Sequence, residues 1–447
     1  MNVIFIALDT CRADHLSAYG YHRRTTPNLE QLAAQGVRFD WCIAQNNATQ
    51  PSYTTMYAGQ HPVTHNIVAH SGHVWLDDSV ALLPEILRRH GVITAAVDDL
   101  YEMKRWFARG YDYYINPAGA RKPHRLVTAD DINERALPLL RHLAAHRGRD
   151  FFLFLHYWDS HTRYQPPPPF DTLYYDGDPR NPAKHSLDPL RGTYFGDVVF
   201  KGWLDDITDA EYITALYDGC LTYADDRVGQ VLHELSSLGL DRDTIVLVTG
   251  DHGESMTEHN IFFDHHGLYD PTLHVPLIVR APGRLPAAAQ VRPMVRHIDI
   301  VPTLLDLLGL PPHEQADGSS LVPLVEGRAR SHVEMVVTTE CSWQCTWGLR
   351  TDRWKYLRAV YPGMHGAPPQ ELYDLQADHG ETRNLADEMP ATRDELDARL
   401  QSWIDEQLRR LGRSEDPLKA QGPSLARRWQ EWERERGGVE ALREDLR

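Results

Sequence analysis

Four short apolar runs constrain the fold of this chain more than any other feature. They are NVIFIAL (2–8), VITAAV (92–97), FFLFLHYW (151–158) and TIVLVTG (244–250). Runs of this length without polar alternation are typical of strands that are buried on both faces of a sheet. Because helix-length segments separate them, they predict an α/β fold with a mostly parallel central sheet flanked by helices.

Aspartate directly follows each of these runs, at positions Asp9, Asp98, Asp159 and Asp251. One aspartate after a strand is commonly the N-cap of the next helix. Four of them are harder to explain in that way. Ligands of parallel sheets bind beyond the carboxyl ends of the strands. We therefore expect a functional site at this edge of the sheet.

The 447 residues can bury a large core, and the pattern of apolar and polar residues changes once along the chain, which divides it into two parts. We predict a catalytic domain over 1–335 and a smaller C-terminal lobe over 336–447, with antiparallel strands followed by a charged helical tail. Residues 165–210 are rich in proline and glycine and read as an ordered insertion that sets specificity. The tryptophans of the tail predict that it packs on the body or on a second subunit, so a homo-oligomer is one expectation.

The formal net charge of −17 disfavours nucleic acid and an anionic membrane surface as partners. No apolar stretch reaches the length of a membrane span, and the start of the chain has no basic region or cleavage site typical of a signal peptide. Five cysteines without framework spacing favour a reducing compartment. The sequence thus predicts a cytoplasmic protein.

A candidate metal site begins with the pair Asp251-His252 at the end of the fourth run. Both side chains can turn toward one cation there, and Asp9 at the end of the first run offers a third ligand. Carboxylate and imidazole donors together suit Mn²⁺ or Zn²⁺. The pair alone is weak evidence, because the chain has 24 histidines.

Thr49, in NNATQPSYTTMYAGQHP (46–62), is the candidate nucleophile. Pro51 fits the first turn of a helix, which places Thr49 at or just before the N-cap. Helix N–H groups and the helix dipole would favour a phosphoryl group there, and a cation on Oγ would activate the hydroxyl. The alternative is an ordinary N-cap threonine without chemistry.

These residues belong to a chain that resembles the sulfatase branch of the alkaline phosphatase superfamily. The resemblance implies an alkaline-phosphatase-like fold. It covers most of the chain and rests on segments in the family's order: IFIALDTCRADHLSAYGY, TTPNLEQLAAQGVRFD, YAGQHPVTHNI, FFLFLHYWDSHTRYQPP, TIVLVTGDHGES, HHGLYDPTLHVPLIVRAPG, HIDIVPTLLDLLGL and ELYDLQADHGETRNLA.

Carried over by position, the resemblance implies metal ligands at Asp9, Asp251 and His252 and a nucleophile at Thr49. Sulfatases carry there a cysteine, less often a serine, within Cys-x-Pro-x-Arg, and oxidise it to formylglycine. Threonine cannot become formylglycine, and the motif's arginine is replaced by Tyr53. With Thr49 as a fourth ligand, the set resembles that of phosphoethanolamine and lipoteichoic acid synthases, and the region around Tyr53 resembles phosphonate monoester hydrolases.

The anion-binding residues of the family are also altered. A lysine and a histidine that grip sulfate fall on Asp99 and Tyr101, and a further lysine falls on His265, whereas His161 is retained. The chain has only six lysines. Together with Tyr53, these four positions are the expected substrate contacts, in a pocket less cationic than that of a sulfatase. Asp99 could instead cap the next helix, bind an amino group or join a second metal.

The resulting hypothesis is a metal-dependent hydrolase of a small-molecule ester, with a phosphodiester or phosphonate monoester favoured. Thr49 attacks phosphorus and forms a phospho-threonine, with His161 and then His265 as the acid–base candidates. One divalent ion is expected. A second is possible at His259, Asp264 and His266. Arg12 and Asp14 either orient the site from behind the ligands or form a plain salt bridge.

Three other functions remain open at this point. One is a sulfatase that works without formylglycine. Another is a phosphotransferase that passes the group to an acceptor other than water; the missing membrane segment counts against it. The third is a non-catalytic binding protein on the same scaffold, which the retained ligands and hydroxyl disfavour.

Overall fold

A computed structural model describes residues 1–118, 126–146, 148–361 and 367–444. In this part of the chain the large sheet has nine strands, and the order along its main path is β4-β3-β5-β1-β6-β7-β2-β8, with β9 paired to β2. Strands β4, β3, β5, β1 and β6 are parallel, and β7 runs antiparallel to β6. The predicted mostly parallel sheet is confirmed.

The four apolar runs form neighbouring strands at the centre of this sheet. Their bounds are β1 Asn2–Leu8, β3 Ile93–Val97, β5 Phe151–Tyr157 and β6 Thr244–Gly250. Every residue in them is buried, as runs without polar alternation predict. The other strands are β2 Val37–Ile43, β4 Tyr113–Ile115, β7 His274–Arg280, β8 Ala289–Val291 and β9 Val295–Arg296.

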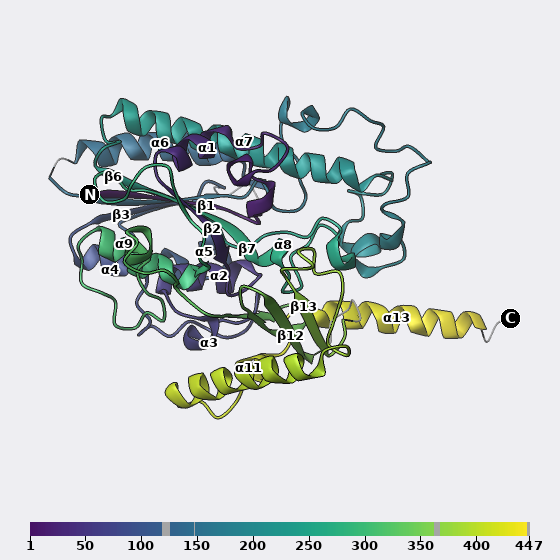
Figure 1. Ribbon diagram of the computed structural model, residues 1–447. Coiled ribbons are helices and arrows are strands. Elements are labelled where there is room, and N and C mark those ends of the chain that lie inside the picture. The colour runs from purple at the N-terminus through teal and green to yellow at the C-terminus, as the bar shows by residue number, and fades with distance from the viewer. Residues whose placement is uncertain (119–125, 147, 362–366, 445–447) are drawn as a thin grey trace.

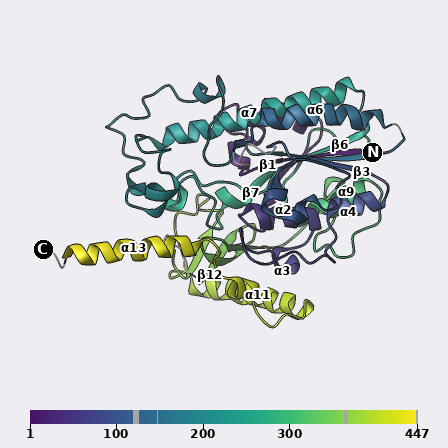
Figure 2. The same ribbon diagram turned by 180° about the vertical axis from the view of Figure 1, so that it is seen from behind.

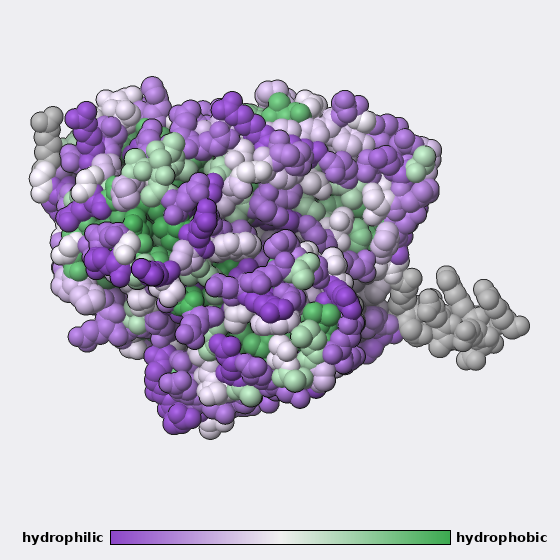
Figure 3. All heavy atoms as spheres, viewed as in Figure 1, coloured by the Kyte–Doolittle hydropathy of each residue, from purple (hydrophilic) through white to green (hydrophobic). Residues whose placement is uncertain are grey.

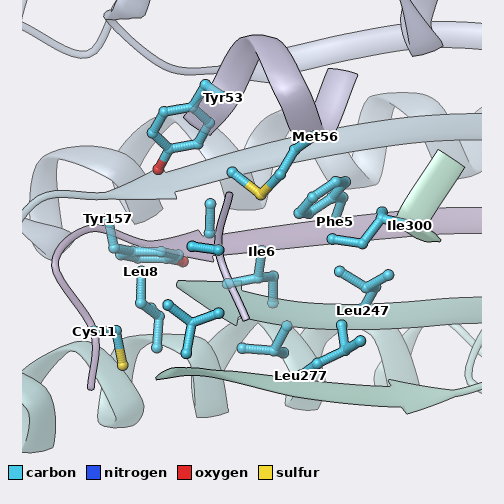
Figure 4. Close-up of a cluster of buried hydrophobic side chains, with 14 of the residues drawn as sticks. Phe5, Ile6, Leu8, Cys11, Tyr53, Met56, Tyr157, Leu247, Leu277 and Ile300 are labelled. Atoms are coloured by element: carbon cyan, nitrogen blue, oxygen red, sulfur yellow. The ribbon is translucent and has the colours of Figure 1, made fainter. Parts of the chain in front are cut away.

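Helices cover both faces of the sheet (Figures 1 and 2). One face carries α1 Pro27–Ala34, α6 Ala129–Ala145 and α7 Ala210–Ser237; the other carries α2 Thr49–Ala58, α4 Leu83–Arg89 and α9 Ile300–Leu307. Figure 4 shows how Tyr53 and Met56 of α2 lie against Phe5 and the neighbouring core residues of the sheet. This packing holds the start of α2 over the carboxyl ends of the strands.

A separate four-stranded antiparallel sheet follows, as the alternating sequence after residue 335 predicts. Its strands are β10 Val336–Cys341, β11 Cys345–Arg350, β12 Trp354–Tyr361 and β13 Gln370–Asp374, and the helices after it are α11 Pro390–Arg410, α12 Pro417–Gln421 and α13 Ala426–Glu444. The division at 335/336 stays a prediction.

The tail packs on the body of the molecule. Trp403 of α11 lies edge-on to Trp347 at 6.3 Å between ring centres, and Trp432 of α13 lies 5.7 Å from Tyr194 of the insertion. Self-association through the tail stays a prediction. The insertion itself holds only short 3₁₀ and π turns, such as Phe195–Val199, in agreement with its composition.

Hydrophilic residues cover most of the face seen in Figure 3. Within the described ranges, no helix has both the length and the apolar character that crossing a membrane requires. All five cysteines are buried, and none forms a disulfide bond. The cytoplasmic location stays a prediction.

Lys355 of β12 gives a test of stability away from the site. It is 1% exposed, and its Nζ lies 2.6 Å from Asp270 and 2.5 Å from Glu381. Replacing it as Lys355→Met leaves the buried Glu381 without its cation, whereas Asp270 keeps its pair with Arg350. We therefore expect a loss of about 3–5 kcal/mol in the free energy of unfolding, measured by urea unfolding. The control is Arg353→Ala, because the pair that the exposed Arg353 makes with Asp374 contributes little to stability. Equal losses in the two variants would contradict this account.

Candidate active site

Three predicted ligands meet at the carboxyl ends of β1 and β6. Asp9 follows β1, and Asp251 and His252 follow β6, which pairs with β1 in a register that aligns Leu8 with Gly250. One ligand atom from each lies within 4.8 Å of the others, and all three residues are fully buried. Asp9 Oδ1 and Asp251 Oδ2 have no hydrogen-bond partner. Buried carboxylate oxygens without donors fit a bound cation.

Backbone groups orient the two ligands from β6. Asp251 Oδ1 accepts hydrogen bonds from the backbone N–H groups of Thr10 (3.0 Å) and His252 (2.9 Å). His252 Nδ1 donates to the carbonyl of Gly253 at 2.9 Å, which leaves Nε2 as the unprotonated nitrogen. Burial lowers the pKa of His252 well below its usual value. A neutral imidazole with Nε2 available is the form that binds a metal.

The surroundings of Asp9 and Asp251 shift the pKa values of the two carboxylates in opposite directions. Burial raises the pKa of Asp251 well above its usual value, and the charge of Asp9 adds to that effect. Burial acts in the same sense on Asp9, but the hydrogen bond from His156 and the nearby histidines lower its pKa overall. Two buried carboxylates this close repel each other, and a divalent cation between them would relieve the repulsion.

Thr49 is the first residue of α2, and Ala48 rather than Thr49 is the N-cap. The prediction that Thr49 lies at or before the N-cap is therefore wrong by one position, and its side chain makes no capping bond. Its hydroxyl instead lies 3.5 Å from His252 Nε2. The Ser52 hydroxyl, one turn along, donates to the carbonyl of Asp251 at 2.5 Å and ties α2 to the ligand loop. The helix start thus presents a hydroxyl to the ligand cluster.

A cavity of about 540 Å³ opens beside Thr49, and both predicted acid–base histidines line it. The rings of His161 and His265 lie 5.8 Å apart, and His265 lies 4.3 Å from the ring of His252. Burial lowers the pKa of His265, but Glu254, 3.4 Å from its Nδ1, and Asp264 outweigh it and raise the value to about 10. His265 is therefore a cation at neutral pH.

His161 is set up differently. Its Nδ1 donates to the carbonyl of Thr162 at 2.8 Å, so Nε2 is the nitrogen left for a reaction. It follows β5 within the loop that also contributes Trp158 to the cavity.

Three predicted substrate contacts do not line this cavity. Tyr53 is fully buried below it, with its ring 4.8 Å from that of His156. Tyr101 is 41% exposed and packs on Tyr114 instead. Asp99 is buried and accepts a hydrogen bond from Trp158 Nε1 at 2.6 Å. Side chains that follow one another in a loop at the edge of the sheet point in different directions, so they need not line the same cavity.

Asp99 also fails as the helix cap that its position suggests. It occupies the N-cap position of α5 Leu100–Met103 without a side-chain capping bond. Asp98 Oδ1 accepts from the N–H of Leu100 at 3.0 Å in its place. Burial and the neighbouring Asp98 raise the pKa of Asp99 to about 7.

Arg12 and Asp14 form the salt bridge that was one of the two expectations, with Arg12 Nη2 and Asp14 Oδ2 2.8 Å apart. The same guanidinium also donates to the carbonyl of Glu254 at 3.0 Å and to Glu258 at 2.7 Å. Burial raises the pKa of Glu258, but Arg12 more than offsets this and lowers it to about 2. Arg12 thus braces the chain just after the ligands Asp251 and His252.

The structure does not bring the residues of the possible second metal site together. His259 stacks on Tyr269 with ring centres 3.6 Å apart, while Asp264 Oδ1 pairs with His266 Nδ1 at 2.8 Å. In the described part of the chain, the other group with metal-ligand spacing is Asp98, Asp99 and His156.

Two histidines of the site, His156 and His70, were not predicted from the sequence. His156 in β5 bridges Asp9 Oδ2 (3.1 Å) and Asp98 Oδ1 (2.9 Å). Burial lowers its pKa, but the two carboxylates raise the value to about 10. The position of His156 inside the apolar run FFLFLHYW is the feature of the sequence that could have identified it. His70 lines the cavity with Thr49, and its backbone N–H donates to Ser342 Oγ at 3.2 Å. The residues around His70 in the sequence carry no comparable signal.

Comparisons with known proteins identify related sequences and structures. The profile of the Sulfatase family matches residues 1–310, and that of the N-sulphoglucosamine sulphohydrolase C-terminal region matches residues 257–410. Arylsulfatase K of Gallus gallus is 36% identical over 202 residues, which cover 43% of this chain and 37% of the relative. The match therefore spans little more than a third of that relative's length.

Solved structures share the fold. The phosphonate monoester hydrolase of Silicibacter pomeroyi has a TM-score of 0.73 at 22% identity and covers 92% of this chain and 95% of its own. A 2-O GAG sulfatase has a TM-score of 0.71 at 21% identity over 91% of this chain and 92% of its own. At these identities the likeness establishes the alkaline-phosphatase-like architecture and nothing finer.

Proposed function

The chain belongs to the sulfatase family, and from this premise we propose that it is a metal-dependent ester hydrolase that cleaves phosphodiesters or phosphonate monoesters with Thr49 as nucleophile. The observation that carries the proposal is the Thr49 hydroxyl, which lies 3.5 Å from His252 Nε2 at the start of α2, next to the buried ligand cluster. A threonine cannot be oxidised to formylglycine. Its own hydroxyl must therefore make the bond to the ester.

The proposed reaction has two steps at phosphorus. The Thr49 hydroxyl first loses its proton to solvent, and Oγ then forms a bond to phosphorus while the bond to the leaving oxygen breaks and His161 Nε2 gives that oxygen a proton. Water then attacks the phospho-threonine, His161 as base takes a proton from the water, and Thr49 leaves as the alkoxide for the next cycle. His265, held as a cation by Glu254, binds a non-bridging oxygen throughout.

Asp9, Asp251, His252 and Thr49 would hold one divalent cation. When bound there, it lowers the pKa of the Thr49 hydroxyl and balances charge on the phosphoryl oxygens. We propose Mn²⁺ or Zn²⁺, because two carboxylates, an imidazole and a hydroxyl form a mixed oxygen–nitrogen set. His156 holds Asp9 in place from behind through its 3.1 Å contact.

The modest positive charge of the cavity supports a substrate with one negative charge. Among the described lining residues there is no lysine, and the arginine, Arg163, is engaged with the carbonyls of Val199 and Lys201 at 3.1 Å each. Of the described lining residues, His265 brings a cationic ring to 4.3 Å from the ring of His252. A dianion would need more compensation than this set offers.

Sulfuric ester hydrolysis is the second candidate, and the relationship to Arylsulfatase K favours it. A panel of chromogenic phosphate monoesters, phosphodiesters, phosphonate monoesters and sulfate esters separates the two. We expect kcat/KM for a diester or phosphonate monoester to exceed that for the matching sulfate ester by about tenfold or more, and chelator to abolish both. Faster turnover of sulfate esters would overturn the phosphoryl proposal.

His161 gives a test with a leaving-group signature. We expect His161→Ala to lower kcat by about 10²-fold for esters with basic alkoxide leaving groups, and much less for p-nitrophenyl esters, whose leaving group needs no proton. The matched control is His185→Ala, because His185 is 69% exposed in its side chain and lies outside the cavity lining. A loss that is the same for all leaving groups would instead assign His161 to binding a non-bridging oxygen.

A further inference from the structure

The cavity beside Thr49 has an apolar region that the reaction at phosphorus does not use. Seven of its lining residues are apolar: Met103, Leu126, Trp158, Val199, Phe200, Trp343 and Leu425. They come from α5, the chain just before α6, the end of β5, the insertion, the turn between β10 and β11, and the chain just before α13. Segments far apart in the sequence thus combine into one apolar surface near the nucleophile.

Aromatic contacts hold this surface rigid. Phe195 lies 5.3 Å from Trp343 and 5.6 Å from Phe200, and Trp343 also lies 5.9 Å from Tyr194. Trp158 is fixed by the 2.6 Å hydrogen bond from its Nε1 to Asp99. A preformed aromatic surface can bind a flat apolar group without first ordering its own side chains.

Three polar side chains of the lining are wholly or partly committed to contacts within the protein. Thr162 Oγ1 bonds the carbonyl of Phe263 at 2.8 Å and Glu254 at 3.0 Å. Asp264 pairs with His266, and Arg163 bonds the carbonyls of the insertion. A polyol such as a sugar must replace its hydrogen bonds to water when it is buried, and groups already bonded within the protein serve it poorly.

Resting on the function proposed above, we propose that this cavity binds an aryl substituent of the ester, so that the natural substrates are aryl rather than sugar or glycerol esters. A volume of about 540 Å³ accommodates such a group. Trp343 and Phe200 are then specificity-determining residues, supplied by the C-terminal sheet and by the insertion.

Symmetric diesters test the proposal, because both of their substituents are the same whichever one enters the cavity. Diphenyl, dimethyl and bis(2,3-dihydroxypropyl) phosphate would be measured as competitive inhibitors of chromogenic diester turnover by the metal-loaded full chain. We expect diphenyl phosphate to bind about tenfold or more tightly than the dihydroxypropyl ester. Trp343→Ala and Phe200→Leu should each weaken diphenyl phosphate several-fold and leave dimethyl phosphate unchanged.

Trp75→Ala is the matched control, since Trp75 is 64% exposed and lies outside the cavity lining. Equal inhibition by the three diesters, or variants that weaken dimethyl phosphate as much as diphenyl phosphate, would overturn the proposal. A chain that turns over only sulfate esters would refute the phosphoryl function. Phenyl sulfate against 2,3-dihydroxypropyl sulfate would then test the aryl preference by itself.

Discussion

Thr49→Ala is expected to reduce turnover of the best ester by on the order of 10⁴-fold, because the variant has no oxygen to bond to phosphorus. The fold should survive, since the Thr49 hydroxyl makes no capping bond and Ala48 remains the N-cap of α2. Asp9, Asp251 and His252 also remain to hold metal. The measurements are kcat on the ester panel, metal content of the purified protein and thermal unfolding.

Two variants sharpen this result. Thr49→Ser restores a hydroxyl and should recover a measurable part of the rate. Thr54→Ala removes a buried hydroxyl from the same helix, one that bonds Gln50 and Trp106 and does not line the cavity, and should leave kcat within a few-fold of wild type. Acid quenching during turnover should trap phosphate on the peptide that contains residue 49. Wild-type turnover by Thr49→Ala would show that another group attacks the ester.

Asp251→Asn is expected to abolish metal binding and lower kcat by about 10³-fold, because a neutral amide is a poor ligand for a hard divalent ion. Its effect on stability should depend on the metal. With chelator present, the variant should unfold at the same temperature as wild type or higher, since burial and Asp9 disfavour the charge of Asp251. With Mn²⁺ or Zn²⁺ added, wild type should gain stability and the variant should not.

The matched control for this variant is Asp299→Asn, a buried carboxylate that is paired with Arg296 and His332 away from the cluster. It should lose stability with and without metal and keep its metal content. If Asp251→Asn bound metal as wild type does, the assignment of Asp251 as a ligand would be wrong.

Much of the fold followed from local pattern. The apolar runs that became β1, β3, β5 and β6 were read correctly because burial on both faces leaves a run without alternation. The antiparallel strands after 335 were predicted from the alternation of the sequence. Asp9, Asp251, His252 and Thr49 were placed by resemblance and by their position after strands, and the structure brings them together.

Other positions failed because contact across the fold decided them. Tyr53 and Asp99 lie beside site residues along the chain, yet one turns into the core under the sheet and the other turns to Trp158. Tyr101 turns outward, where it packs on Tyr114. The set His259, Asp264 and His266 looked like ligands in sequence, but stacking on Tyr269 and internal pairing disperse it. Sequence spacing does not fix the direction of a side chain within a loop.

The sequence alone therefore determined the α/β sheet, the edge of the sheet at which the candidate ligands lie, and the threonine at position 49, because each of these follows from consecutive residues. Only the tertiary structure decided which groups surround that threonine. His156 reaches Asp9 because β5 pairs with β1, and His70 and Trp343 reach the cavity because the C-terminal sheet packs against the ends of the strands. Such contacts join residues more than a hundred positions apart, and no local pattern of side chains records them.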